Sequence, residues 1–303
     1  MRRASKVVAL LTAGSLGLAA CGTSVQKTLK GAISSVGAQQ YLQVRVNADV
    51  AGTGAQAASA AAVEKYAKLL SLTLSEQSTG GGAISTAGTA LNQRLTLAVG
   101  STPLLTLISI GSRLYVDLDF STLASLPGVG VTTSELTGLQ LLLGGRWFEL
   151  PSTTLNRYVP KAERSATNSS AQRQIEQRAM DALTKLIERT PSTSTGHGYA
   201  QRGTLQSVVT ALEPVMALVT HRAATTTHAV PGTYRLALSL SGGVATAAQV
   251  GVSVPGGHRG SMSVTLNATI THDATPVSAP SPVTVVTPAF LKGLSGLTGS
   301  VKL

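Results

Sequence analysis

The chain has 303 residues, of which 24 are lysine or arginine and 13 are aspartate or glutamate, so its formal net charge is +11. The basic residues are scattered and only 3% of the chain is aromatic, which argues against a nucleic-acid partner, because such sites combine clustered charge with stacking rings. A single cysteine excludes an internal disulfide.

The first twenty residues have the parts of a secretory signal peptide in order. Residues 2–6 contain three basic side chains, and residues 7–18 form an apolar run without charge. That run is too short to span a bilayer as a mature helix. Two alanines then precede Cys21. The pattern predicts an exported protein with a leader at residues 1–20.

Leu18-Ala19-Ala20-Cys21 resembles the lipobox of bacterial lipoproteins. The resemblance implies cleavage after Ala20, a diacylglycerol on the Cys21 sulfur, and an acyl chain such as palmitate on the new amino terminus. The alternative is an ordinary signal peptide with an incidental cysteine. Loss of the leader removes three basic and no acidic residues, so the net charge falls from +11 to +8. This charge suits anionic headgroups, but a solvated basic surface that aids solubility is the more common explanation. We therefore expect a lipid anchor at the extracytoplasmic face of the cell membrane.

The first half of the mature chain is predicted to be mainly strands. Apolar residues at helical spacing over 25–36 predict a short amphipathic helix, and strict alternation over 42–50 predicts a half-buried strand. Residues 51–69 are predicted to form a loop or a helix, and apolar and polar residues alternate again over 70–75, which predicts a second strand. Further strands are expected at 94–99, 104–110, 113–119 and 146–150, with a tight hairpin at Gly111-Ser112 and an irregular excursion over 120–145.

The middle of the chain is predicted to be helical and its end to return to strands. Apolar stripes run along 172–189 and 204–221, and Pro214 is expected to kink or break the second helix. Alternation predicts four closing strands, at 234–240, 250–254, 262–270 and 283–287.

Short turns between most strands favour antiparallel pairing, and each strand has one apolar and one polar face. We therefore expect an α+β fold: a curved antiparallel half-barrel sheet with helices covering its concave apolar face. The predicted organisation is a signal peptide (1–20), a lipidated cysteine with tether and N-terminal helix (21–40), one half-barrel domain (41–290) with central helices (about 155–222), and a C-terminal tail (291–303).

Three segments resemble a known family. Residues 108–118 (ISIGSRLYVDL), residues 145–150 (GRWFEL), and the Pro-Val then Val-Thr-x-x-x-Pro order over 268–288 are similar to the mycobacterial LppX/LprG lipoproteins, which are related in fold to the LolA and LolB lipoprotein carriers. The order of elements matches over most of residues 25–290. The resemblance implies a U-shaped half-barrel, helices over its mouth and an apolar cavity that carries or presents envelope lipids. The irregular excursion at 120–145 and the long central segment are departures from the pattern of a compact family member.

The inner faces of the predicted strands supply the candidate lipid-cavity lining. Trp147, the only tryptophan, either lines a lipid entrance or fills the core. The expected function is binding and transport of a lipid ligand; the alternative is a structural lipoprotein without a cavity that binds another envelope protein. The candidate lining residues are Leu95, Leu97, Leu114, Val116, Leu118, Trp147, Leu236, Leu238, Leu240, Val264 and Leu266.

No catalytic motif is found in the sequence, so we do not expect an enzyme. The five histidines are dispersed, and His221 and His228 lie seven apart, which is weak metal spacing. Asp117 and Asp119 are expected on the outer strand face. Such a carboxylate pair could do acid–base work or bind a cation, but the more common role is to keep a wet sheet face soluble, paired with Arg113. We expect no metal and no cofactor beyond the lipids, and a monomer.

Overall fold

The structure is a computed structural model that describes residues 31–32, 35–87, 90–126, 145–151, 178, 181–182, 185–220, 229–272, 276–287 and 289. The predicted signal peptide, Cys21 and the tail at 291–303 lie outside the described residues, as do 127–144 of the predicted excursion. The predicted helix at 172–189 is described only in part, and its described residues from 178 to 189 are helical.

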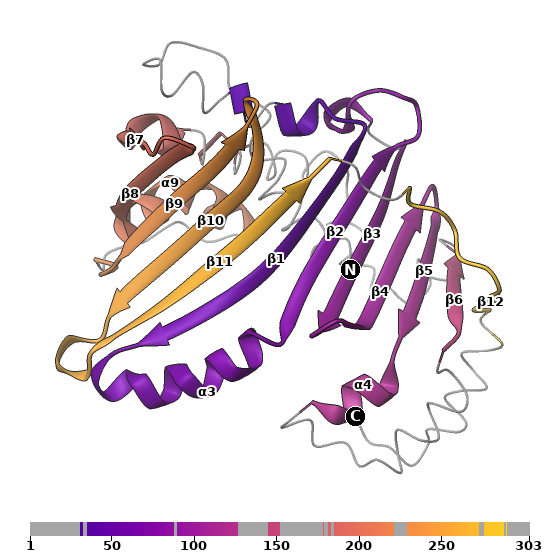
Figure 1. Ribbon diagram of the computed structural model, residues 1–303, viewed down its shortest axis with the longest axis horizontal. Coiled ribbons are helices and arrows are strands. Elements are labelled where there is room, and N and C mark those ends of the chain that lie inside the picture. The colour runs from indigo at the N-terminus through magenta and orange to yellow at the C-terminus, as the bar shows by residue number, and fades with distance from the viewer. Residues whose placement is uncertain are drawn as a thin grey trace.

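Twelve strands of the described chain form one sheet, which twists from β7 at one edge to β12 at the other (Figure 1). The spatial order is β12-β6-β5-β4-β3-β2-β1-β11-β10-β9-β8-β7. The strands are β1 (Tyr41–Gly52), β2 (Leu70–Ser78), β3 (Leu91–Val99), β4 (Thr102–Ile110), β5 (Arg113–Leu118), β6 (Trp147–Pro151), β7 (Ser192–Ser194), β8 (Gly198–Thr204), β9 (Thr233–Ser241), β10 (Val244–Pro255), β11 (Ser261–Thr271) and β12 (Val283–Val285).

The prediction of an α+β protein with a large antiparallel sheet is confirmed, with one correction. Every neighbouring pair is antiparallel except β12 with β6, which is parallel. The β12 strand does not follow its neighbour through a tight turn, because about 130 residues separate it from β6, so the rule that short turns give antiparallel pairs does not apply. Within the described residues the sheet ends at β12 and at β7, so it is not a closed barrel.

Few helices accompany the sheet in the described chain. Helix α9 contacts β8 and continues through Pro214, so of the two predicted effects of this proline a break is wrong, while a kink stays a prediction. Gly52 at the end of β1 lies so near α3 that a Cβ there would come within 2.6 Å of the Ala60 Cβ, which explains the glycine. The helices with bounds are α3 (Ala57–Ala67), α4 (Phe120–Ser125), α9 (Leu205–Thr220) and the 3-10 turns η1 (Gly54–Gln56), η2 (Ile84–Thr86) and η3 (Gly257–Arg259).

The fifth strand ends one residue earlier than predicted because Asp119 caps α4. Its Oδ1 accepts hydrogen bonds from the backbone N–H groups of Ser121 (2.9 Å) and Thr122 (3.1 Å). Such a bond satisfies amides that lack a partner in the first turn. Hydrogen bonds, first from Ser121, lower the pKa of Asp119. The residue that alternation assigned to the strand therefore starts a helix.

Strands β7 and β8 were not predicted, because polar groups fix them. The Gln201 side chain in β8 is 2% exposed and donates to the carbonyl oxygens of Ile187 (2.8 Å) and Thr190 (3.2 Å). Thr190 in turn shares a 2.9 Å hydrogen bond with the Tyr234 hydroxyl of β9. These bonds join the central helical residues to the sheet without an apolar alternation that a sequence pattern would reveal.

Candidate functional site

The cross-strand register decides which residues share a face of the sheet, because directly paired residues point the same way. One line of pairs runs Val44–Leu74–Leu95–Leu107–Val116 across β1 to β5. Another runs Ala48–Leu266–Val250–Leu236 across β1, β11, β10 and β9. We call the side that carries these residues the inner face and the opposite side the outer face.

Ten of the eleven predicted lining residues lie on the inner face. The register brings them together although they come from four strands and are far apart in sequence. Leu238 is 9% exposed, while the other nine are half-buried. The ten are Leu95, Leu97, Leu114, Val116, Leu118, Leu236, Leu238, Leu240, Val264 and Leu266.

Trp147 is the exception, since it lies on the outer face. It packs against a second apolar cluster formed by Ile108, Tyr115 and Val277. It also borders a hollow of about 320 Å³ between β3, β4 and residues 278–280. The alternation had implied that the outer face is polar throughout, and this is not so. The C-terminal segment crosses the outer face and is held there by a 2.8 Å hydrogen bond from Val277 N–H to Gln77 Oε1.

One end of the inner face is a compact core, and we call it the closed end. Leu42, Val44 and Ile270 are 2%, 2% and 8% exposed there. They are covered by Ala32 and Val36 of the N-terminal helical residues, with Ile84 and Ala245 in the same cluster. The amphipathic helix predicted before the first strand thus supplies the cover at this end through Val36.

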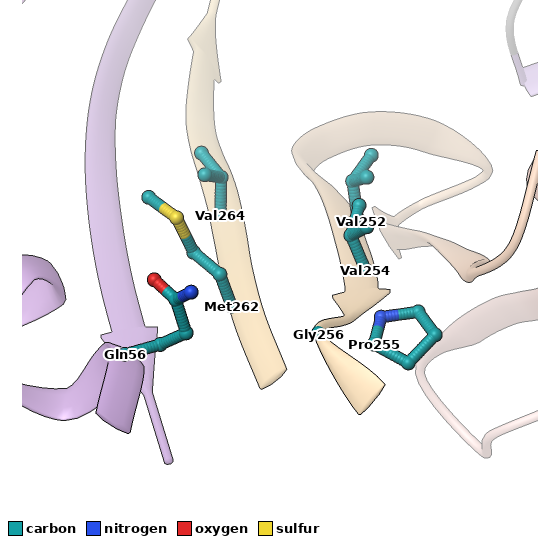
Figure 2. A pocket seen from close by; sticks show the side chains of 7 residues that line it. All are labelled: Gln56, Val252, Val254, Pro255, Gly256, Met262 and Val264. Atoms are coloured by element: carbon teal, nitrogen blue, oxygen red, sulfur yellow. The ribbon is translucent and has the colours of Figure 1, made fainter. Parts of the chain in front are cut away.

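The other end of the inner face, which we call the open end, lies where α3 and the turn between β10 and β11 meet (Figure 1). A hollow of about 350 Å³ is found here. Figure 2 shows Val252 and Val254 of β10 beside Met262 and Val264 of β11, with Gln56 of η1 at the margin. Val264 is a predicted lining residue, whereas Val252, Val254 and Met262 were missed although their strand alternation places them on the same face.

A carboxyl group also lies on the inner face, in phase with the leucines of β2. Glu76 is 5% exposed, pairs across the sheet with Leu42 and Gln93, and accepts a 2.7 Å hydrogen bond from Gln93 Nε2 at Oε1. Burial raises the pKa of Glu76, and the bond from Gln93 acts in the opposite direction. The sequence contained a signal for this buried carboxyl group: Glu76 continues the alternating series Leu70, Leu72, Leu74 at a position where an apolar residue would be expected.

The predicted acidic pair on the outer face is rearranged. Asp119 caps α4, and burial, followed by the charge of Asp119, raises the pKa of Asp117. Arg113 approaches Glu149 instead, with 3.6 Å between Nε and Oε1. No three histidine, cysteine, aspartate or glutamate side chains gather as a metal site within the described residues. No helix in the described ranges is long and apolar enough to cross a bilayer.

The fold and the inner face define an α+β protein built on one wide open sheet with an aliphatic side. No family model and no curated protein matches the sequence. Among solved structures, the crystal structure of the Mycobacterium tuberculosis lipoprotein LppX is similar, at 11% identity and a TM-score of 0.34, over 84% of this chain and 98% of that one.

Proposed function

We propose that this chain is a lipid-anchored cell-envelope protein whose inner sheet face binds the acyl chains of a lipid and carries or presents it. The observation that carries the proposal is an aliphatic face that is closed at one end and half-exposed at the other. Acyl chains need no directional bonds: each methylene that leaves water contributes about 0.8 kcal/mol. Headgroup contacts would then decide which lipid is bound.

The arrangement that we infer is a half-barrel with helices over its concave side. Two observations support it. Ile187 of the central helical residues packs against the closed-end core, and α9 lies against β8 with Gln206 Oε1 accepting from Val230 N–H at 2.7 Å. A hollow of about 350 Å³ is at the lower end of ligand-site volumes of roughly 300–1,000 Å³. Lipid entry would therefore widen the site.

The anchor is tested by labelling. Cys21→Ser should abolish incorporation of labelled palmitate and release the protein from membranes, because the lipobox resemblance assigns the thiol as the acylated group. If the basic surface alone attached the protein to membranes, without a lipid anchor, attachment would depend strongly on salt concentration. Undiminished labelling of the variant would contradict the anchor.

Lipid binding is tested by native mass spectrometry of the mature protein purified from its own membranes, together with thermal melts. Bound lipid should appear as a mass adduct and raise the melting temperature, since a ligand of the folded state stabilises it by mass action. Val264→Trp, which fills the open-end hollow, should lower lipid occupancy. The matched control Thr265→Trp, one residue away on the outer face, should leave occupancy unchanged.

The alternative function, an interaction lipoprotein without a lipid site, makes a different prediction. Its inner face would serve only as a core beneath the helices. Both tryptophan variants would then change stability alone, and added phospholipid would leave the melting temperature of the wild-type protein unaffected. That outcome would replace the carrier proposal.

A further inference from the structure

Helix α3 has an unusual outward side for a surface helix. Ala60 is buried, and Glu64 and Ala67 are partly buried against the rest of the protein. The exposed residues within the helix are alanines, a serine, Val63, Tyr66 and a single charged side chain, Lys65. A helix that lies on a sheet in water normally presents a polar outward side. The outward side of α3 therefore lacks the polarity that water contact favours.

The same end of the molecule carries most of the large apolar side chains that are exposed in the described chain. Val63 (46%), Tyr66 (40%) and Leu69 (40%) lie on or directly after α3, and Val254 (42%) lies at the end of β10 beside the hollow. The fifth, Val285, is in β12. Apolar surface that is gathered in one place, and not scattered singly, marks an interaction surface.

We propose that this open end docks on the surface of an anionic phospholipid bilayer, with α3 at the headgroup boundary and the hollow facing the lipid. The inference rests on the proposed function and deepens it by naming where lipid enters. The docking surface consists of Val63, Lys65, Tyr66, Leu69 and Val254. Aliphatic residues enter the acyl boundary in such contacts, and a tyrosine suits the interface because its ring is apolar and its hydroxyl is wet.

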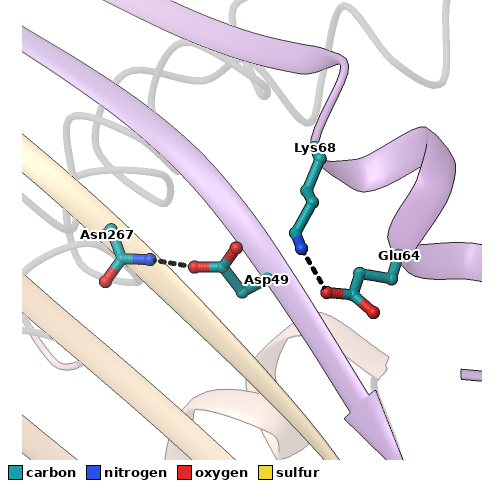
Figure 3. A network of polar contacts seen from close by, with 4 residues as sticks. All are labelled: Asp49, Glu64, Lys68 and Asn267. Carbon is teal, nitrogen blue, oxygen red and sulfur yellow. Dashed lines mark hydrogen bonds and ion pairs between the residues drawn. The ribbon is translucent and has the colours of Figure 1, made fainter. Parts of the chain in front are cut away.

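Charge on the docking surface favours an anionic bilayer. Figure 3 shows Lys68 turned toward Glu64, with 2.5 Å between Nζ and Oε1, while Asp49 faces Asn267 of β11 and accepts its hydrogen bond. Lys68 balances the charge of Glu64, whereas Asp49 keeps its negative charge because the amide donor is neutral. Among the five residues of the docking surface the charged side chain is Lys65, which is exposed and makes no ion pair with a described residue. The predicted mature chain as a whole has a net charge of +8, which adds attraction to the anionic headgroups.

The predicted anchor leaves the open end within reach of the bilayer. Residue 31 precedes Ala32, which lies at the closed end, and ten residues from Cys21 span at most about 35 Å. Ala32 shares the closed-end core with Val44, and the stretch from Val44 to Gly52 at the other end of β1 spans about 26 Å at roughly 3.3 Å per residue. The tether is therefore long enough to allow docking through the open end.

The experiment uses the full mature lipoprotein, anchored in vesicles of phosphatidylcholine with phosphatidylglycerol. With Cys21 acylated, an introduced cysteine is the only free thiol and accepts an environment-sensitive fluorophore. A probe at Ala62→Cys, on the exposed side of α3, should emit at shorter wavelength and be quenched by lipid-borne quenchers. The matched probe at Ser241→Cys, exposed at the last residue of β9 at the closed end, should show neither effect. Equal signals from the two probes would overturn the proposal.

A second part of the experiment tests the attraction between Lys65 and the anionic lipid. Lys65→Gln should lower the ratio of docked to undocked probe about fivefold, because one lysine near an anionic surface contributes about that factor. Lys185→Gln, an exposed lysine on the central helical residues, should change it little. If the probe at position 62 instead responds to protein concentration in detergent, the surface binds a second copy and the proposal fails. Lipid occupancy measured on the same samples separates the docking proposal from the lipid-binding proposal. If the protein does not dock but still contains bound lipid, only the docking proposal is refuted.

Discussion

The closed and open ends of the inner face are made from the same strands but differ in burial. At the closed end Leu42 and Val44 are each 2% exposed beneath the N-terminal helical residues. At the open end Val264 is half-buried and Val254 is 42% exposed beside a hollow. Alternation in the strands thus determines which face a side chain occupies, whereas the segments that cross the face determine whether it is sealed from water.

The difference also bears on ligand binding. Protein interiors are packed about as densely as organic crystals, so a sealed core has no space for an acyl chain. A half-buried aliphatic surface keeps part of its area in water and gains free energy when a ligand covers it. The closed end therefore stabilises the fold, and the open end is where the proposed ligand gains most.

Leucine truncation at the closed end and in the half-buried middle of the inner face provides the largest contrast. Leu42→Ala at the closed end should cost about 2–5 kcal/mol of unfolding free energy, because a cavity remains in a filled core. Leu266→Ala, half-buried in the middle of β11, should cost about 1 kcal/mol, since only part of the side chain leaves an apolar environment. Urea unfolding of the delipidated proteins, with unchanged slopes, measures both. Equal losses would mean that the inner face is equally sealed at the two positions.

Added phospholipid gives a second comparison of the same two leucine variants. Added phospholipid should raise the midpoint of the wild-type protein, and Leu266→Ala should gain less from it than Leu42→Ala, because only Leu266 lies on the half-buried surface that the ligand is proposed to cover. The difference between the two variants should therefore be smaller with lipid than without. A difference that lipid leaves unchanged would place any binding elsewhere.

Much of the sheet could be predicted from the sequence because its strands have period-2 alternation. Ten inner-face residues were identified from that pattern, and the register confirms that they share a face. The turn at Gly111 could also be predicted, since its backbone adopts a positive φ of 56°, which glycine tolerates best. Local chemistry decides these features, so a local pattern reveals them.

The remaining features depend on contacts between distant segments. Trp147 alternates in its own strand, but its neighbours Ile108 and Val277 come from other parts of the chain, and only the fold shows that it faces outward. Strand β8 is fixed by Gln201 bonding to carbonyl groups of the central helical residues. The hollow at the open end is bordered by η1 and the β10–β11 turn together with Val252 and Met262, which come from different segments of the chain. No alternation encodes such relations.

The smallest predicted effect concerns the carboxyl group at the closed end. Burial raises the pKa of Glu76 above its ordinary value of 4.5, so the folded protein holds this proton to a higher pH than the unfolded chain does. Between those two pKa values the folded state binds more protons, and linkage then requires stability to fall as pH rises. Above the raised pKa the whole penalty for the buried charge is present, and below pH 4.5 it is absent.

Glu76→Gln removes that penalty while an amide can still hydrogen-bond Gln93, whose Nε2 lies 2.7 Å from Glu76 Oε1. The variant should melt at a higher temperature than the wild-type protein at pH 7 and at the same temperature at pH 4, because the wild-type carboxyl is then neutral in both states. Glu64→Gln is the matched control: its partner Lys68 is exposed, so the change should be small and should not favour the variant at neutral pH. Thermal melts at the two pH values measure both variants. A Glu76→Gln protein that is less stable at pH 7 would show that the closed end holds the carboxylate in its charged form, with water or another group beside it, and that this end of the inner face is not sealed.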